Sequence, residues 1–174
     1  MRLAAADRNR RNLRGFSLVE LAVAIAVLSA LLYFLLDRVL YMQEMAEKVE
    51  MEETLRSINY GLRLEAASRL TRGPDPRQVP LEKENPIKWL STPPRNYLGE
   101  YAKVPEGAKP AYWYFHPGAR QLIYRPNRAE RLTVDSAKGK ELSFDVRADG
   151  STFEPQLAPH SPYVWFGDPA AKNR

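Results

Sequence analysis

A run of 21 largely apolar residues, 16–36, constrains this chain more than any other feature of its sequence. As a helix it would be about 31 Å long, which matches the roughly 30 Å hydrocarbon core of a bilayer. Residues 1–15 hold five arginines and one aspartate, and basic residues beside a span favour the cytoplasmic side of a membrane. The sequence therefore predicts a single transmembrane helix at 16–36 whose N-terminal side stays in the cytoplasm.

An ordinary secretory signal differs from this segment in two ways. Its apolar core is about 7–15 residues long, and a small-residue cleavage site follows that core. Here the small residue at the boundary of the run is Gly15, which precedes the run. Cleavage at Gly15 would therefore leave the apolar segment on the mature protein.

One carboxylate, Glu20, lies inside the apolar run. An ionised carboxylate in hydrocarbon is costly unless it is paired or hydrated. The apolar run contains no cationic side chain, so one hypothesis gives Glu20 a positively charged partner outside its own segment. The alternative places Glu20 close enough to the membrane surface to stay hydrated.

The helical pattern continues beyond the apolar run, because the first proline of the chain lies in the Gly73-Pro74 pair. From Asp37 onward, charged residues accompany a narrower apolar stripe with spacings of three and four, which is typical of a helix that buries one face. We expect one helix from Phe16 to just before Gly73-Pro74, in which residues 37–72 form an amphipathic continuation of the span outside the membrane. The stripe consists of Met51, Leu55, Ile58, Leu62, Ala66 and Leu70.

Residues 73–174 are expected to form a loop-rich globular domain. Prolines punctuate residues 73–110, which predicts connecting structure with one short helical turn near 87–90. We expect Trp89 and Leu90 to anchor this connection to the helix.

Strand patterns follow the connecting region. Two aromatic and β-branched runs, 111–115 and 121–125, flank a Pro-Gly turn and predict a β-hairpin. Residues 141–147 alternate apolar and polar side chains as a half-buried antiparallel strand does, and 163–166 predict a last short strand. The fold class is therefore predicted to be α+β, with one long helix packed on a small antiparallel sheet.

Charge and composition narrow the function classes. The net charge is +5, of which residues 1–15 carry +4 and the remaining 159 residues only +1. A nucleic-acid-binding domain carries its positive charge on its folded part, so DNA binding is favoured only if four arginines gather on one face. The absence of cysteine excludes disulfides, thiolate zinc sites and cysteine nucleophiles. The four arginines are Arg120, Arg125, Arg128 and Arg131.

Residues 14–21, Arg-Gly-Phe-Ser-Leu-Val-Glu-Leu, resemble the cleavage and methylation signature of type IV pilins and of the pseudopilins of type II secretion. The resemblance implies that a prepilin peptidase removes a leader peptide, residues 1–15, by cutting between Gly15 and Phe16. The same enzyme class would methylate the new amine of Phe16. The resemblance also implies that Glu20 pairs with the N-terminal amine of a neighbouring subunit, which lowers the cost of both charges in apolar surroundings.

The resemblance further implies a type IV pilin-like fold and a structural, non-enzymatic role. The subunit would lie in the bacterial inner membrane with its domain in the periplasm. It would assemble with other pilin or pseudopilin subunits, on an inner-membrane platform, into a periplasmic or surface fibre. Many major pilins have a proline where this chain has Asp37, and some have a C-terminal disulfide that this chain cannot form.

Both departures suit a pseudopilin or a minor pilin better than a major fibre subunit, and the leading interpretation is a pseudopilin of a type II secretion-like system. Two alternatives remain open. One is a minor pilin of a type IV pilus that serves adhesion, motility or DNA uptake. The other is a membrane-anchored periplasmic binding domain or enzyme, which would keep its activity without the span.

The aromatic hairpin offers a further candidate site. Tyr112, Trp113, Tyr114 and Tyr124 could form a surface for a partner or ligand. The alternative makes them the core of the sheet, which the strand propensity of aromatic residues favours.

Three aspartates and two histidines are candidate metal or catalytic groups. Asp145, Asp149 and Asp168 could bind calcium, but their spacing fits no defined ligand loop and favours turn and surface roles. His116 and His160 each lie beside or near a proline, without supporting residues in the pattern of a catalytic or metal site. We therefore expect no catalytic residue, no cofactor and no metal site.

Overall fold

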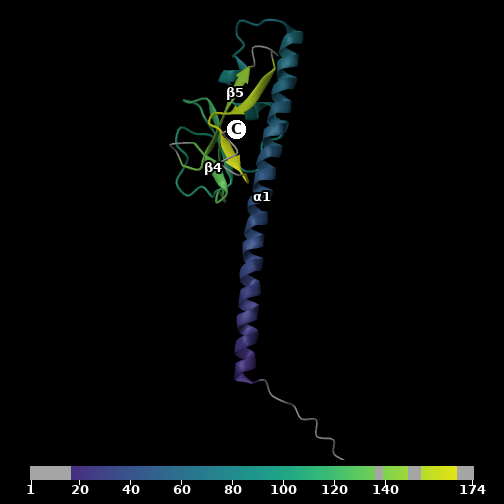
Figure 1. Cartoon of the computed structure of the whole chain (residues 1–174). Coiled ribbons are helices and arrows are strands. Elements are labelled where there is room, and N and C mark those ends of the chain that lie inside the picture. The colour runs from purple at the N-terminus through teal and green to yellow at the C-terminus, as the bar shows by residue number, and fades with distance from the viewer. Residues whose placement is uncertain (1–16, 136–138, 149–153, 168–174) are drawn as a thin grey trace, which may run out of the picture. The chain divides into compact units, whose positions relative to one another are not determined.

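The computed structural model describes residues 17–135, 139–148 and 154–167. Within these ranges one helix, α1 (Leu18–Arg72), is followed by two short 3-10 turns, η1 (Leu81–Lys83) and η2 (Pro86–Trp89), and then by seven strands (Figure 1). The chain divides into two compact units whose boundary falls after Leu40, inside α1. The predicted α+β class, a long N-terminal helix with a small sheet, is confirmed.

The end of α1 follows from its local sequence. The N–H of Gly73 donates to the carbonyl of Arg69 at 3.1 Å, and Gly73 adopts a φ of 82°. Glycine tolerates this left-handed conformation without a Cβ clash, which is why it commonly closes helices. The predicted end before Gly73-Pro74 is confirmed, whereas the predicted start at Phe16 lies outside the described residues.

The main sheet contains five strands in the order β1-β2-β3-β5-β6, and β4 and β7 form a second, two-stranded sheet. All neighbouring pairs are antiparallel except β1 and β2, which run parallel. The parallel edge strand is an addition to the antiparallel sheet that the sequence predicts. The strands are β1 (Tyr97–Glu100), β2 (Tyr112–His116), β3 (Gln121–Arg125), β4 (Leu132–Val134), β5 (Leu142–Ala148), β6 (Pro155–Pro159) and β7 (Tyr163–Trp165).

The predicted hairpin, the alternating strand and the last short strand are confirmed as β2-β3, β5 and β7. In β5 the alternate residues Leu142, Phe144 and Val146 are buried, as the pattern predicts. Three strands were missed. β1 and β4 are three or four residues long, and β6 begins and ends with proline, which weakens any strand pattern.

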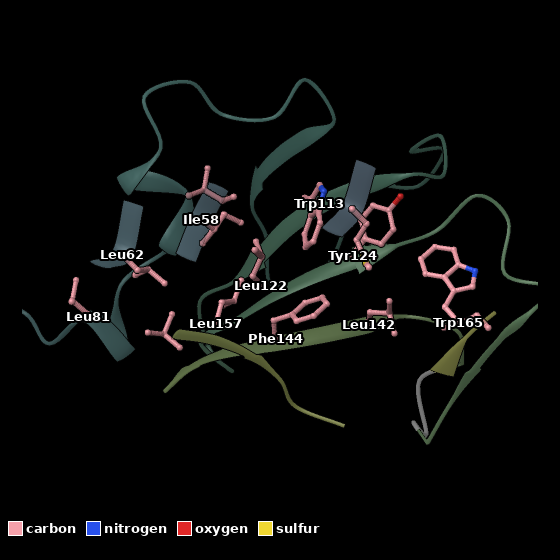
Figure 2. Close-up of a cluster of buried hydrophobic side chains, with 14 residues drawn as sticks. Ile58, Leu62, Leu81, Trp113, Leu122, Tyr124, Leu142, Phe144, Leu157 and Trp165 are labelled. Atoms are coloured by element: carbon pink, nitrogen blue, oxygen red, sulfur yellow. The ribbon is translucent and has the colours of Figure 1, made fainter. Parts of the chain in front are cut away.

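The core lies between the inner face of the main sheet and the 41–72 part of α1. Figure 2 shows Ile58 and Leu62 of α1 close to Leu122, Phe144 and Leu157 of the strands. Aromatic rings fill much of the sheet side, with the Trp113 ring centroid 4.6 Å from that of Tyr124 and 5.9 Å from that of Phe144. The apolar stripe of α1 therefore has the partner that its spacing predicts.

The prediction that α1 buries a continuous apolar stripe is wrong at one position, Leu70. Met51, Ile58 and Leu62 are buried, but Leu70 is 80% exposed. The core cluster includes Ala66 as its last partly buried residue on α1. Leu70 lies one turn beyond the packing surface, so the helical spacing continues where the burial does not.

The connecting region is fastened to α1 at Gly61. A Cβ placed on Gly61 would lie 2.5 Å from the carbonyl oxygen of Trp89, so only a glycine lets the two backbones approach this closely. Trp89 and Leu90 are partly buried against the core. Their predicted role as anchors is confirmed, and Gly61 is the residue that permits it.

Arg69 makes a second attachment for the same region. Its guanidinium donates to Glu65 at 2.9 Å, to Glu84 at 3.0 Å and to the carbonyl of Val79 at 2.7 Å. The guanidinium carbon also lies 5.2 Å from the centroid of the Trp89 ring, within the range of a cation–π contact. Since one side chain bonds helix and connection at once, the long loop-rich segment is held in one position.

Candidate functional site

The N-terminal unit exposes apolar side chains around the helix from Leu18 to Leu36, with Glu20 as the one charged residue in that stretch. From Leu18 to Leu36, its large apolar side chains are between 48% and 85% exposed. Among the described residues, α1 is the one helix that is long and apolar enough to cross a membrane. A signal sequence near the N-terminus can be equally long and apolar. The residues around the apolar segment therefore decide between a signal sequence and a membrane span.

The start of α1 has a local cause that includes Glu20. The hydroxyl oxygen of Ser17 accepts the N–H of Val19 at 3.3 Å, and the carbonyl of Ser17 accepts the N–H of Leu21 at 3.0 Å. Ser17 is thus placed as an N-cap, and Glu20 lies three residues later in the first turn. Serine followed at this spacing by glutamate is the pattern of a capping box, and a carboxylate in the first turn is favoured by the helix dipole.

The structure gives Glu20 no hydrogen bond or ion pair with any residue in the described ranges. Gly15 and Phe16, the residues predicted to flank the cleavage site, lie outside those ranges. The predicted roles of these three residues in processing and assembly stay predictions.

Sequence reasoning missed a buried carboxylate on α1, Glu44, which is fully buried at 0% exposure. It accepts the backbone N–H of Arg131 at 2.9 Å and the indole N–H of Trp165 at 3.0 Å. The Arg131 guanidinium donates to its other oxygen at 3.0 Å and also lies 4.9 Å from the centroid of the Tyr41 ring. A buried charge requires such pairing, because an isolated one would cost several kcal/mol, on the order of the desolvation of an ion.

These contacts decide the ionisation of Glu44. Burial on its own would raise the pKa of the carboxyl. The hydrogen bonds from the Arg131 backbone, Trp165 and the Arg131 side chain, together with the positive charge of Arg131, outweigh burial and lower the pKa below its ordinary value. Glu44 is therefore a charged group in the folded domain at neutral pH.

A second glutamate, Glu47, binds the loop between β3 and β4 from the next turn of α1. Its carboxylate accepts the backbone N–H groups of Asn127 at 2.6 Å and Arg128 at 3.0 Å. It also accepts the hydroxyl of Tyr124 at 3.0 Å. Burial, followed by the nearby charge of Glu47, raises the pKa of Tyr124, so this phenol stays protonated and donates.

The sequence contains a signal for both glutamates. Extending the apolar stripe from Met51 toward the N-terminus by steps of three and four reaches Glu47 and then Glu44. Carboxylates in the register of a buried stripe need partners from the domain that covers it. That register predicts polar contacts at these positions.

The proposed aromatic partner surface is contradicted by burial. Tyr112, Trp113, Tyr114 and Tyr124 are each less than 9% exposed, and a surface for a partner needs exposed side chains. Trp113 and Tyr124 belong to the core beside α1. Tyr112 and Tyr114 lie on the other face of β2, where residues of the 101–108 segment cover them, and burial raises the pKa of Tyr114 to about 12.

Ion pairs weaken the case for a DNA-binding face built on the four arginines. Arg125 pairs with Glu141 at 3.4 Å, Arg128 with Glu130 at 2.9 Å and Arg131 with Glu44 at 3.0 Å. Three of the four positive charges therefore have a carboxylate partner inside the domain.

The histidines and aspartates show local roles where they are described. The Nδ1 of His116 accepts the N–H of Ala119 at 2.9 Å within the hairpin turn. His160 Nδ1 and Asp145 Oδ2 lie 2.6 Å apart, beside Arg147. Within residues 17–135, 139–148 and 154–167, no cluster of three or more side chains suited to a metal ion is found, and the predicted alternatives Asp149 and Asp168 lie outside these ranges.

Comparison with known proteins gives one finding about family. Residues 10–32 match the family model described as the prokaryotic N-terminal methylation motif. No curated protein and no solved structure matches the chain. The matched segment contains Gly15, Phe16 and Glu20, and it supports a type IV pilin-like protein that a prepilin peptidase processes, without distinguishing a pilin from a pseudopilin.

Proposed function

We propose that this chain is a structural subunit of a pilin-like assembly, and specifically a pseudopilin of a type II secretion-like system. One observation carries the proposal. The segment that matches the methylation motif leads directly into a helix whose apolar side chains, from Leu18 to Leu36, are exposed on every side. Such a surface is satisfied by lipid before assembly and by neighbouring apolar helices after it.

The proposed sequence of events starts at the cytoplasmic face of the inner membrane. A prepilin peptidase cuts between Gly15 and Phe16 and methylates the amine of Phe16. The domain lies in the periplasm, and an inner-membrane platform adds the subunit to a short fibre. Glu20 accepts the N-terminal amine of a neighbouring subunit, so the ion pair sets the axial register of the two helices.

Two features support a pseudopilin or a minor pilin over a major pilin. α1 continues without a break through Asp37, where many major pilins have a proline. The chain also has no cysteine and cannot form the C-terminal disulfide of some major pilins. Pilin-like subunits are structural proteins, and the motif match supports this class of role over catalysis.

The direct test is mass spectrometry of the mature N-terminus in protein purified from the native membrane. The expected product begins at a methylated Phe16. A Gly15→Leu variant should keep residues 1–15, because a bulky side chain does not fit where the peptidase accepts glycine. A matched control, Ala5→Leu, places the same bulk elsewhere in the leader and should be processed normally. Wild-type protein that starts at Met1 contradicts the proposal.

A second experiment separates the secretion system from the pilus. The chromosomal gene is deleted, and both secreted enzymes and surface pili are measured in the same strain. Loss of secretion with intact pili supports a pseudopilin. Loss of pili with intact secretion instead identifies a minor pilin.

A further inference from the structure

The part of α1 that first meets the domain is attached differently from the part that follows. The apolar core cluster takes its first α1 residue at Met51. Before that point, α1 contacts the domain through Glu44, Glu47 and the ring of Tyr41, whose centroid lies 5.2 Å from that of Phe166. Residues 41–50 are therefore held mainly by directional polar contacts rather than by apolar burial.

The two carboxylates act on the same neighbouring structure. Together they accept six hydrogen bonds, from β3, from the 126–131 loop and from β7. Three of the donors are backbone N–H groups, which belong to Asn127, Arg128 and Arg131. The carboxylates thereby fix the course of the loop that leads into β4, as well as the end of β7.

These contacts respond to displacement in a different way from the core. Hydrogen bonds to a carboxylate weaken steeply once distance and angle depart from their narrow optimum. Apolar packing is non-directional, and most of its free energy is retained when side chains shift slightly. A small movement of residues 41–50 would therefore break the carboxylate contacts together while leaving the packing of Ile58 and Leu62 in place.

We propose that Glu44 and Glu47 form a carboxylate clamp, a conformational device that holds residues 41–50 of α1 on the 126–131 loop and the β4-β7 sheet. The clamp opens as one unit, without unfolding the five-stranded main sheet. Charged neighbours complete it on both sides: Arg131 faces Glu44, while Arg128 is paired with Glu130 and Lys140 donates to the carbonyl of Ala129.

The clamp would bear a mechanical load if the subunit is pulled out of a membrane by its helix. This part of the inference rests on the proposed function. A pull from the N-terminal side of α1 reaches residues 41–50 before it reaches Met51 along the chain. The clamp would then be the first attachment to bear the load, and its opening would lengthen the free part of the helix by about 15 Å for ten residues.

Hydrogen exchange of the full-length chain in detergent micelles at pH 7 tests the clamp. In the double variant Glu44→Gln with Glu47→Gln, amides of residues 126–134 should exchange about tenfold faster or more, as expected when bonds to charged acceptors are lost. Amides of β3 and of residues 142–146 in β5 should stay within about twofold of the wild type, because their packing remains.

The chain offers a matched control with the same spacing and the same loss of charge. Glu50 and Glu53 are exposed carboxylates three residues apart on the next turns of α1. The double variant Glu50→Gln with Glu53→Gln should leave the exchange of residues 126–134 unchanged. Equal exchange in the clamp variant and this control would overturn the proposal.

The wild-type chain provides a second measurement that does not depend on a variant being folded. Exchange is followed at increasing urea below the unfolding transition. Amides of Asn127 and Arg131 should exchange through a smaller opening than amides of Ile58 and Phe144. One common opening for all four amides would overturn the clamp, whereas an unprocessed N-terminus with the expected exchange pattern would contradict only the proposed function.

Discussion

The two halves of α1 are one continuous helix and yet meet opposite requirements. Residues 18–36 are apolar around the helix surface apart from Glu20 and Ser29, and residues 18–40 have no buried position in their own unit. Residues 41–72 bury a single stripe, including Met51, Ile58 and Leu62, against a sheet. The difference shows that backbone continuity does not decide what a helix packs on: the angular spread of apolar side chains does.

Polar residues follow the same division. In the apolar run the carboxylate is Glu20, which forms no hydrogen bond or ion pair with the described residues, whereas in the second half Glu44 is enclosed by donors from the domain. Glu44 thus satisfies its charge inside the fold, whereas a partner for Glu20 outside the chain stays a prediction.

The largest expected effect comes from a substitution in the first half of α1, and it concerns assembly rather than folding. Glu20→Ala should insert, be cleaved and fold, but lose most co-purification with partner subunits, because the cation of a neighbour no longer has a partner in an apolar setting. Detergent extraction followed by pull-down measures this. Ser29→Ala, in the same segment, is the control and should assemble normally. Normal recovery of partners with Glu20→Ala contradicts the pairing role.

Ile58→Ala tests the second half. Removal of this fully buried side chain should cost about 2–5 kcal/mol of domain stability, through lost burial and a cavity. Urea unfolding of the full-length chain, followed by tryptophan fluorescence, gives the value. Leu64→Ala removes a side chain that is 61% exposed and should cost much less. Similar losses for the two variants would show that the buried stripe is misplaced.

Gly61→Ala tests whether the close approach between the backbones of α1 and Trp89 requires glycine. Alanine normally stabilises a helix interior by about 1 kcal/mol relative to glycine. Here its Cβ would meet the carbonyl of Trp89, and overpacking of this kind costs about 1–3 kcal/mol, so we expect a net loss of stability. Ser57→Ala, on the exposed side of the same helix, is the control. A more stable Gly61→Ala protein would show that the 89–92 segment moves away freely.

Glu44→Gln should have a small effect of about 1–2 kcal/mol at pH 7, because glutamine still accepts hydrogen bonds but loses the charge. The pKa of Glu44 is lowered from 4.5 in the folded domain. Its stabilisation is therefore fully present above about pH 4.5 and is lost as the pH falls through the lowered value. Urea midpoints of wild type and variant should converge in acid, and a gap that stays constant with pH would rule out this linkage.

Local pattern predicted those parts of the fold in which it repeats over many residues. The helix, the β2-β3 hairpin and β5 each show a regular spacing that one face of a sheet or helix imposes. β1 and β4 were missed because they are only three or four residues long and carry no aromatic run, and β6 was missed because a proline stands at each of its ends. Their pairing depends on strands that are distant in the sequence, such as β4 with β7.

The candidate site divides in the same way. The processing motif is a contiguous string of residues, so residues 14–21 could be interpreted from sequence alone. Glu44 and Glu47 have meaning only through donors more than 75 residues away, and the sequence indicates only that carboxylates enter a buried stripe. For the aromatic residues of β2 and β3, strand propensity favoured a core role over a partner surface, and both faces of these strands are covered.

The outer edge of β6 bears on whether copies of the protein at high density can pair through their sheets. Prolines stand at both ends of this strand, and the side-chain oxygen of Asn59 on α1 accepts the N–H of Leu157 at 2.6 Å. An uncovered strand edge can recruit a strand of another molecule and begin amyloid-like growth. With this edge occupied, copies that gather at high density are steered away from joining sheet to sheet at β6, which leaves their helices free to govern how they associate.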